Sequence, residues 1–260
     1  MDGLAELPEY LSASSISTFE QCPLKYKLSR VDKIKEPPTR ETLLGVFVHE
    51  VMEKLYAIST VGDRNILNAK QISAEIWSTN DWATQVTPYL KGMTMQTFRW
   101  NAWWCIENLF KMENPAAINV RGIEYELNSD IKGVKIKGFI DRLARIDGSD
   151  TISDYKTGKT PKDRYLDGKF FQLILYFVCL SKTEIMKDPK LELLYLKDGE
   201  RRLIEPTPEL CAETIETVVT VNEKIQTCNK SSSWDAIPST LCNWCFFKYN
   251  GCTLYVKKTR

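Results

Sequence analysis

The residues on either side of Pro115 follow two different periodicities, and this change limits the folds open to the chain. After Pro115, three short runs have the composition of β-strands and are separated by turn residues. An apolar helix, two more strands and an amphipathic helix follow. Strands interleaved with helices in this way predict an α/β fold with a mixed central sheet. The predicted strands span 119–127, 134–146, 151–156, 191–196 and 202–206, and the predicted helices span 165–182 and 208–229.

Before Pro115, apolar residues recur at helical spacing. A short helix is predicted over 12–30, with serines as its N-caps, and a longer one over 41–59. Residues 60–115 are rich in tryptophan and are predicted to form a helical insertion. We interpret these tryptophans as core residues, with stacking on DNA bases as the alternative. The whole chain, 1–260, is expected to form one domain.

Composition excludes several classes of protein. Lys and Arg together number 35 and Asp and Glu 34, so the formal net charge is +1. A nucleic acid or an anionic membrane could therefore bind only to a local patch of positive charge. No apolar run reaches the roughly 18 residues of a membrane span, because the longest, Phe170 to Leu180, contains Gln172. The N-terminus carries Asp2 and Glu6 and lacks the basic region of a signal peptide. We therefore expect an intracellular protein without a membrane partner.

Two acidic residues, Asp141 and Asp154, lie on consecutive predicted strands that a tight hairpin would bring together. Two carboxylates at one site repel each other unless a cation neutralises them, and Mg²⁺ or Mn²⁺ suits such oxygen ligands. Alternation along a strand places Lys156 on the same side as Asp154 and Tyr155 on the other. A lysine there can position a water nucleophile or stabilise charge on a phosphate. The alternative is a surface strand with an ordinary Asp–Lys pair.

Three further polar residues lie among apolar neighbours. His49, the only histidine, lies on the predicted helix 41–59, where partial burial would make an unpaired imidazole costly. A metal would give its nitrogen a partner, and the alternative is a satisfied core or surface histidine. Gln172 and Tyr176 are four residues apart and share one face of an apolar helix. They need partners, which a catalytic lysine, a DNA phosphate or an internal network would supply.

The C-terminal tail contains Cys242, Cys245 and Cys252, a C-x₂-C-x₆-C pattern. Clustered thiolates suit zinc or an iron–sulphur cluster, and each usually takes four ligands. We take Cys22 as the fourth, which would tie segment 12–30 to segment 231–260. Zinc remains the alternative on spacing alone. The other cysteines are interpreted as core or helix-surface residues: Cys105, Cys179, Cys211 and Cys228.

Read in order, these patterns resemble one family. They are Cys22-Pro23, Gly45-x₃-His49, Gly138-x₂-Asp141, Asp154-x-Lys156, Gln172-x₃-Tyr176 and Cys242-x₂-Cys245-x₆-Cys252. Together they resemble the RecB-like branch of the PD-(D/E)xK nucleases, in particular its iron–sulphur members. Those include the CRISPR-associated RecB-like exonucleases, the AddB nuclease domain and related phage exonucleases. The resemblance extends from Ser12 to Cys252.

The resemblance implies a restriction-endonuclease-like core and two metal centres. It implies a [4Fe–4S] cluster on Cys22, Cys242, Cys245 and Cys252. It implies Mg²⁺ or Mn²⁺ bound by His49, Asp141, Asp154 and the backbone carbonyl of Tyr155. Lys156 would be the catalytic lysine, and Gln172 and Tyr176 would orient it or contact DNA. Glu124, on the strand before Asp141, is a further candidate to support the site.

The implied function is a metal-dependent DNA exonuclease that acts on single-stranded or free ends, in the cytoplasm of a bacterial or phage-infected cell. After Lys156 comes a basic stretch suited to a phosphate backbone, formed by Lys159, Lys162, Arg164 and Lys169. On the alternative view it is a solvated helix start, offset by neighbouring aspartates. No P-loop of a helicase motor is present in the sequence.

Two other functions stay open from the sequence. One is a DNA-binding or processing subunit of a recombination, repair or CRISPR-adaptation complex with little nuclease activity of its own. The other is a zinc-ribbon interaction protein. The sequence identifies no particular protein partner.

Overall fold

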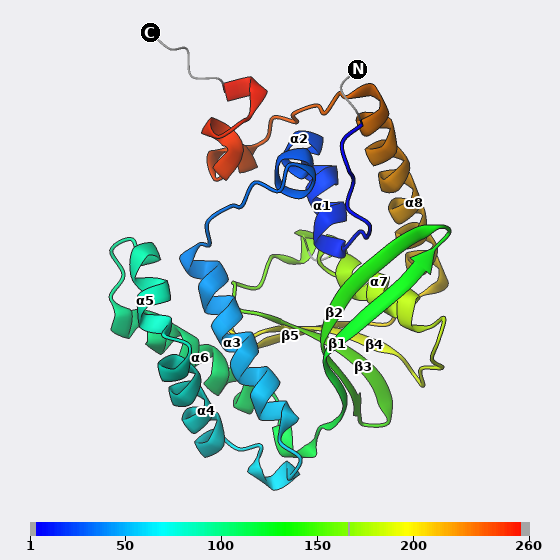
Figure 1. Cartoon of the computed structure of the whole chain (residues 1–260). Helices are drawn as coiled ribbons and strands as arrows, with labels where there is room; N and C mark the ends of the chain where they lie inside the picture. The colour runs from blue at the N-terminus through cyan, green and yellow to red at the C-terminus, as the bar shows by residue number, and fades with distance from the viewer. Residues whose placement is uncertain (1–3, 166, 256–260) are drawn as a thin grey trace.

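The sheet predicted after Pro115 is present in the computed structural model, which describes residues 4–165 and 167–255 (Figure 1). Its five strands follow the order β1-β2-β3-β4-β5. All neighbouring pairs are antiparallel except β3 and β4, which are parallel, so the predicted mixed sheet is confirmed. The strands are β1 (Asn119–Ile131), β2 (Val134–Ile146), β3 (Ser149–Lys156), β4 (Lys190–Tyr195) and β5 (Glu200–Ile204).

Helices cover both faces of the sheet, and each face has its own hydrophobic core. On one face lie α1 (Ala13–Gln21), α2 (Pro23–Tyr26), α7 (Phe171–Leu180) and α8 (Pro208–Ser231). On the other lie α3 (Arg40–Ala57), α4 (Ile66–Thr79), α5 (Trp82–Val86) and α6 (Met95–Met112). Figure 1 shows α4, α5 and α6 grouped on the outer side of α3. Helix α7 provides the crossover that the parallel pair β3–β4 requires.

Two predicted helices differ from the observed ones. The helix predicted over 12–30 starts at its Ser12 N-cap but ends at Gln21, and a second helix begins at Pro23, which occupies its first turn. Proline lacks the N–H that would continue the first helix. The helix predicted from residue 165 starts at Phe171, because the charged segment before it forms short 3₁₀ turns at Asp163–Tyr165 and Asp167–Lys169.

The tryptophans of 60–115 divide into two groups. Trp82 is buried at 3% exposure, and Trp77 and Trp103 pack partly against the core, as the sequence predicted. Trp100 and Trp104 are 58% and 37% exposed, so the core interpretation is wrong for these two. Trp104 Nε1 donates to the Lys197 carbonyl, in the turn after β4, at 3.0 Å.

Segments from the two ends of the sequence pack against each other. The Trp234 ring stacks on Tyr26, with 6.0 Å between ring centroids. The Leu24 N–H donates to the Asp235 carbonyl at 3.1 Å. Figure 1 shows the C-terminal segment lying beside α1 and α2. Residues 256–260, the end of the predicted iron–sulphur region, lie outside the described residues. Within the described part of the chain, no helix has the length and apolar character needed to cross a bilayer.

Candidate active site and cysteine pocket

The end of the β2–β3 ladder brings the two predicted acidic residues together. The last paired residues before Asp141 are Arg142 and Ser153. Beyond them, Asp141 Oδ2 accepts a hydrogen bond from the Tyr155 N–H at 2.9 Å. Asp154, which lies between Ser153 and Tyr155 on β3, is 4% exposed. The two carboxylates therefore face a common region where the strand pairing stops.

Lys156 and Gln172 contact the two oxygens of Asp154. Lys156 Nζ lies 2.6 Å from Asp154 Oδ2, which agrees with the predicted placement of both residues on one side of β3. Gln172 Nε2, from α7, donates to Asp154 Oδ1 at 3.1 Å. The sequence suggested the lysine, a phosphate or an internal network as the partner of Gln172. The hydrogen bond to Asp154 agrees with the internal network.

Tyr176 lies one turn further along α7 and packs on β2. Its ring occupies the space above Gly138, because a Cβ on Gly138 would lie 2.4 Å from Tyr176 Cε1. Burial raises the pKa of the Tyr176 hydroxyl to about 12. Tyr176 is therefore neutral and held against the strand that carries Asp141. Glycine at position 138 is required by this close approach.

His49 reaches the site from α3. Its Nε2 lies 2.8 Å from the Tyr155 carbonyl oxygen, and its Nδ1 lies 3.5 Å from Asp141 Oδ2. The imidazole thus lies between the Tyr155 carbonyl and the Asp141 carboxylate, the two groups that were expected to bind a metal together with it. The T-shaped contact between the His49 and Tyr155 rings, with centroids 5.7 Å apart, also fixes its orientation.

Glu124 completes a group that can hold a metal ion. Among the described residues, His49, Glu124 and Asp141 form the group whose ligand atoms all lie within 4.8 Å of one another. Glu124 has φ of 43°, a left-handed conformation that is costly for a residue with a side chain. On β1, Ile123 pairs with Arg142 and Tyr125 pairs with Ile140, while Glu124 between them is not itself paired. The pairs on either side place Glu124 opposite Asp141. The sequence predicted only a supporting role for Glu124.

Asp154 is paired with Lys156, but Asp141 and Glu124 face other acidic groups, with the imidazole of His49 beside them. Burial and, next, the neighbouring Asp154 raise the pKa of Asp141 to about 7. Burial also raises the pKa of Glu124, with Glu53 and Asp154 adding repulsion. A divalent cation would relieve this repulsion, because carboxylate oxygens and one imidazole are ligands that such ions accept. The donor set therefore fits a divalent metal.

The open side of the site is a groove beside α3. It is lined by Gly45, Val46, His49, Glu50, Glu53 and Glu124. The predicted basic stretch follows β3 and leads into α7, and its four basic residues are exposed: Lys159, Lys162, Arg164 and Lys169. The Thr160 N–H donates to Asp198 Oδ2 at 2.6 Å, which anchors the start of this segment.

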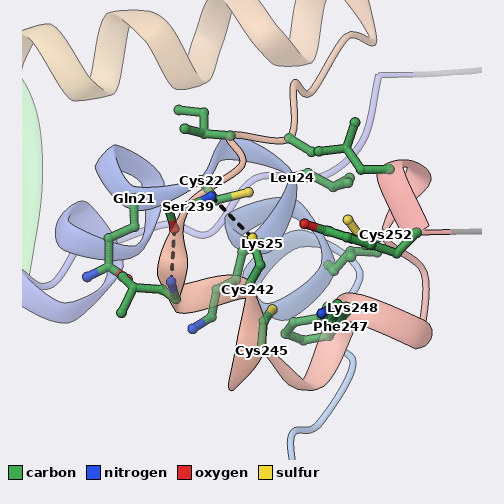
Figure 2. Close-up of a pocket in the computed structure, with 16 residues that line it drawn as sticks. Gln21, Cys22, Leu24, Lys25, Ser239, Cys242, Cys245, Phe247, Lys248 and Cys252 are labelled. Atoms are coloured by element: carbon green, nitrogen blue, oxygen red, sulfur yellow. Dashed lines mark hydrogen bonds between the residues drawn. The ribbon is translucent and has the colours of Figure 1, made fainter.

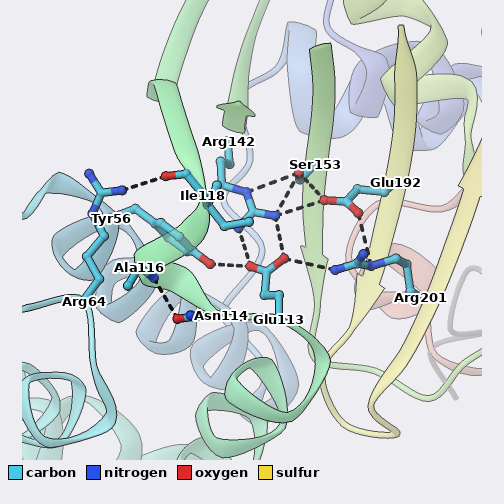
Figure 3. A network of polar contacts seen from close by, with 10 residues as sticks. All are labelled: Tyr56, Arg64, Glu113, Asn114, Ala116, Ile118, Arg142, Ser153, Glu192 and Arg201. Carbon is cyan, nitrogen blue, oxygen red and sulfur yellow. Dashed lines mark hydrogen bonds and ion pairs between the residues drawn. The ribbon is translucent and has the colours of Figure 1, made fainter. Parts of the chain in front are cut away.

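A buried ion network lies on the opposite face of the same strands (Figure 3). Arg142 is fully buried and pairs with Glu113, at the end of α6, and with Glu192 on β4, at 3.0 Å. Arg201 also reaches both glutamates, at 3.1 and 3.3 Å. The positive charges of the two arginines thus neutralise the negative charges of the two glutamates. Sequence reasoning missed this network, although Arg142 directly follows Asp141. It ties the helical insertion to the strands that carry the site.

The four cysteines expected to bind a metal line one pocket (Figure 2). Cys22 lies between α1 and α2, and Cys242, Cys245 and Cys252 come from the C-terminal segment. The Ser239 N–H points to Cys242 Sγ at 3.4 Å, and this contact lowers the pKa of the Cys242 thiol. The remaining cysteines do not line this pocket; Cys105 and Cys179 are buried, and Cys211 and Cys228 pack against the core.

Comparison with known proteins identifies the family. A model of the PD-(D/E)XK nuclease superfamily matches residues 10–249. The chain belongs to this superfamily. This PD-(D/E)XK protein therefore has a nuclease fold whose members use divalent metals, and the cluster of His49, Glu124 and Asp141 agrees with that chemistry.

Individual relatives cover almost all of this PD-(D/E)XK protein. The gene 69 protein of Mycobacterium phage D29 is 23% identical over 261 residues, which cover 92% of this chain and 95% of the relative. The gene 69 protein of Mycobacterium phage L5 is 22% identical over 286 residues, covering 92% and 94%. A solved structure from Eubacterium rectale, provisionally described as an exonuclease, is similar with a TM-score of 0.55 and 14% identity, covering 91% of this chain and 88% of that one. The last likeness concerns the fold alone.

Proposed function

We propose that this protein is a metal-dependent deoxyribonuclease that degrades DNA from its ends, with a preference for single strands. The observation that carries the proposal is the convergence of His49, Glu124 and Asp141 beside the Asp154–Lys156 pair. Membership of a nuclease superfamily supports hydrolysis of phosphodiesters. The exposed basic stretch after β3 supports contact with a phosphate backbone. Phage relatives are consistent with action inside an infected bacterial cell.

Each residue has a distinct part in the proposed reaction. His49, Glu124 and Asp141 would hold Mg²⁺ or Mn²⁺, with Asp154 and the Tyr155 carbonyl next to them. Such an ion, when bound, polarises the phosphate and lowers the pKa of a bound water. The Lys156 ammonium stabilises negative charge that develops on the phosphate and orients the attacking water.

The supporting residues fix this arrangement before DNA binds. Gln172 holds one oxygen of Asp154, so that Lys156 contacts the other. Tyr176, packed over Gly138, keeps α7 against β2. Preorganised groups of this kind need no rearrangement at the moment of reaction.

The test is a cleavage assay on single- and double-stranded DNA labelled at the 5′ or the 3′ end, with Mn²⁺ and with EDTA. We expect Mn²⁺-dependent loss of label from single strands, and no cleavage by Asp154→Ala or Lys156→Met. Asp63→Asn, which changes an exposed aspartate at a distance from the site, is the matched control. Wild-type rates in Asp154→Ala would refute the site. Binding without cleavage by the wild type would favour a DNA-binding subunit instead.

We also propose that Cys22, Cys242, Cys245 and Cys252 hold a structural [4Fe–4S] cluster. All four line one pocket between segments from the two ends of the chain, as Figure 2 shows. Among the described cysteines, no three Sγ atoms lie within 4.8 Å of one another. A tetrahedral zinc site with Zn–S bonds of about 2.3 Å needs sulphurs about 3.8 Å apart. A [4Fe–4S] cluster also takes four thiolates, so metal analysis separates the two.

The cluster is tested by measuring iron, acid-labile sulphide and zinc in protein purified without oxygen. We expect iron and sulphide in equal amounts in the wild type and their loss in Cys245→Ser. Cys211→Ser, which changes a partly buried cysteine outside the pocket, should retain both. Stoichiometric zinc without iron would refute the proposal and favour a zinc site.

A further inference from the structure

A second groove lies on the helical insertion, between α4 and α6. One face of α4 contributes Lys70, Ser73, Ala74 and Trp77, and one face of α6 contributes Arg99 and Trp100. The groove has a volume of about 530 Å³. Pockets of roughly 300–1,000 Å³ hold drug-sized ligands, so there is room here for nucleotides. The groove takes no part in the site described above.

An exposed aromatic pair lies at the edge of this groove. Trp100 is 58% exposed, and its ring stacks on that of Trp104, one helical turn away, with centroids 5.4 Å apart and planes inclined by 18°. Large exposed aromatic surfaces on soluble proteins usually mark binding sites. A flat, exposed indole that is held by a second ring is a suitable surface for another planar ring to stack on.

Basic side chains lie over the rings of this region, while Glu107 Oε1 accepts a hydrogen bond from Trp103 Nε1 at 2.6 Å. The Arg99 guanidinium lies 5.0 Å from the centre of the Trp77 ring, and Lys111 Nζ lies 4.4 Å from that of Trp104. Lys70 adds a third exposed cation on α4. No acidic residue is among the described residues that line the groove. The charge therefore complements a polyanion, although the whole chain is almost neutral.

We propose that this groove binds single-stranded DNA. A base stacks on Trp100, and Lys70 and Arg99 contact the phosphates on either side. Alternating aromatic and basic groups are the combination that binds single strands without reading their sequence, whereas paired bases have no free face to offer. The choice of DNA rests on the nuclease function proposed above.

The groove is separate from the catalytic site and acts as an anchor for the strand. Phe47 lines the groove, whereas His49, two residues further along α3, belongs to the metal cluster. Residues two apart on a helix point in nearly opposite directions, so α3 lies between the two sites. At the end of α4, Asn80 Nδ2 donates at 2.6 Å to Oε1 of Glu50, which lines the open side of the catalytic site. A strand held at the groove therefore reaches the site only if it spans α3.

Binding is measured by fluorescence anisotropy with a labelled oligothymidine of about 15 nucleotides, in EDTA so that no cleavage occurs. We expect Trp100→Ala to raise Kd by at least about 5-fold, which corresponds to the loss of one stacked base. Arg99→Glu should raise Kd and make the dependence on salt shallower by about one phosphate contact. Both positions are exposed, and far-UV circular dichroism should show an unchanged fold.

Tyr10→Ala is the matched control, because it removes another exposed aromatic, 40% exposed, with Lys135 Nζ 5.7 Å from its ring. Its Kd should equal that of the wild type. The proposal is overturned if Trp100→Ala and Arg99→Glu both bind within 2-fold of the wild type, or if oligothymidine does not bind; a protein partner for the groove would then be the better explanation.

The two proposals fail separately. Groove-dependent binding by a wild-type protein that does not cut DNA would refute the nuclease function alone. Normal cutting with unchanged binding in both groove variants would refute the groove alone.

Discussion

The crowding of acidic groups around Asp141 predicts that this residue destabilises the metal-free protein. Replacing it with Asn removes the charge and keeps an oxygen that can accept the Tyr155 N–H. We therefore expect Asp141→Asn to unfold at a higher temperature than the wild type in EDTA at pH 8, although the change abolishes cleavage.

The magnitude follows from the pKa of Asp141, which rises from 3.8 to about 7 on folding, mainly through burial. A raised carboxyl pKa means that the folded state binds the proton more tightly. The stability that this proton contributes to the wild type is therefore lost as the pH rises from about 4 to about 7, and none of that contribution remains well above 7. About three pKa units at 1.36 kcal/mol each give an upper bound of about 4 kcal/mol. For a domain of this size, about 2–4 °C in Tm accompany each kcal/mol.

The assay compares the Tm of the two proteins in EDTA at pH 5 and at pH 8, with Asp63→Asn as a control for the loss of an exposed charge. The gap between wild type and Asp141→Asn should be larger at pH 8. Adding Mn²⁺ should raise the Tm of the wild type and narrow the gap, since a ligand that binds only the folded state stabilises it. An equal gap at both pH values, or a less stable Asp141→Asn at pH 8, would contradict this account of the site.

Three further outcomes follow from the same structure. Lys156→Met should reduce cleavage at least 100-fold while Mn²⁺ still raises the Tm, because the lysine acts on the reacting groups; a thermal shift assay and a kinetic assay together check this. Arg142→Met leaves Glu113 buried without its main partner and should cost about 3–5 kcal/mol in the free energy of unfolding, measured with urea; a loss below 1 kcal/mol would show that the network contributes little. Gly138→Ala should displace the Tyr176 ring and lower kcat more than KM changes, and Tyr176→Ala should partly rescue it by opening the space.

Much of the fold could be predicted from the sequence because its periodic segments agree with their packing. The strands around Asp141 and Asp154 were placed within a few residues of their observed bounds, and the hairpin between them brings the carboxylates to one end of the sheet. The three clustered cysteines and Cys22 line one pocket, and their role as ligands stays a prediction. One turn determines the relation of the two strands, and a short spacing groups the three C-terminal cysteines. Cys22 lies far from them in the sequence and was chosen because a metal site usually takes four ligands.

The parts that were missed depend on local conformation or on distant partners. Glu124 was predicted only to support the site, because its position opposite Asp141 depends on the register between β1 and β2, which the sequence alone does not determine. The partner of Arg142, Glu113, lies 29 residues away at the end of α6, which no pattern in either segment indicates. Whether Trp100 faces the core or solvent depends on how α6 is rotated against α4, and the tryptophan-rich sequence is compatible with either.

The contact between the two ends of the chain has a consequence for how the protein is made. Asn229 donates a hydrogen bond to the carbonyl of Ala5, 224 residues earlier, and Trp234 covers the ring of Tyr26. A ribosome that adds about 5–20 residues per second needs about 10–45 s to synthesise the stretch between such partners. During that time the apolar side chains of α1 and α2 are exposed, because the C-terminal segment that packs on them has not yet been made. Chaperones can bind these side chains, and aggregation can start from them. Slower growth after induction and co-expressed chaperones should therefore raise the soluble yield.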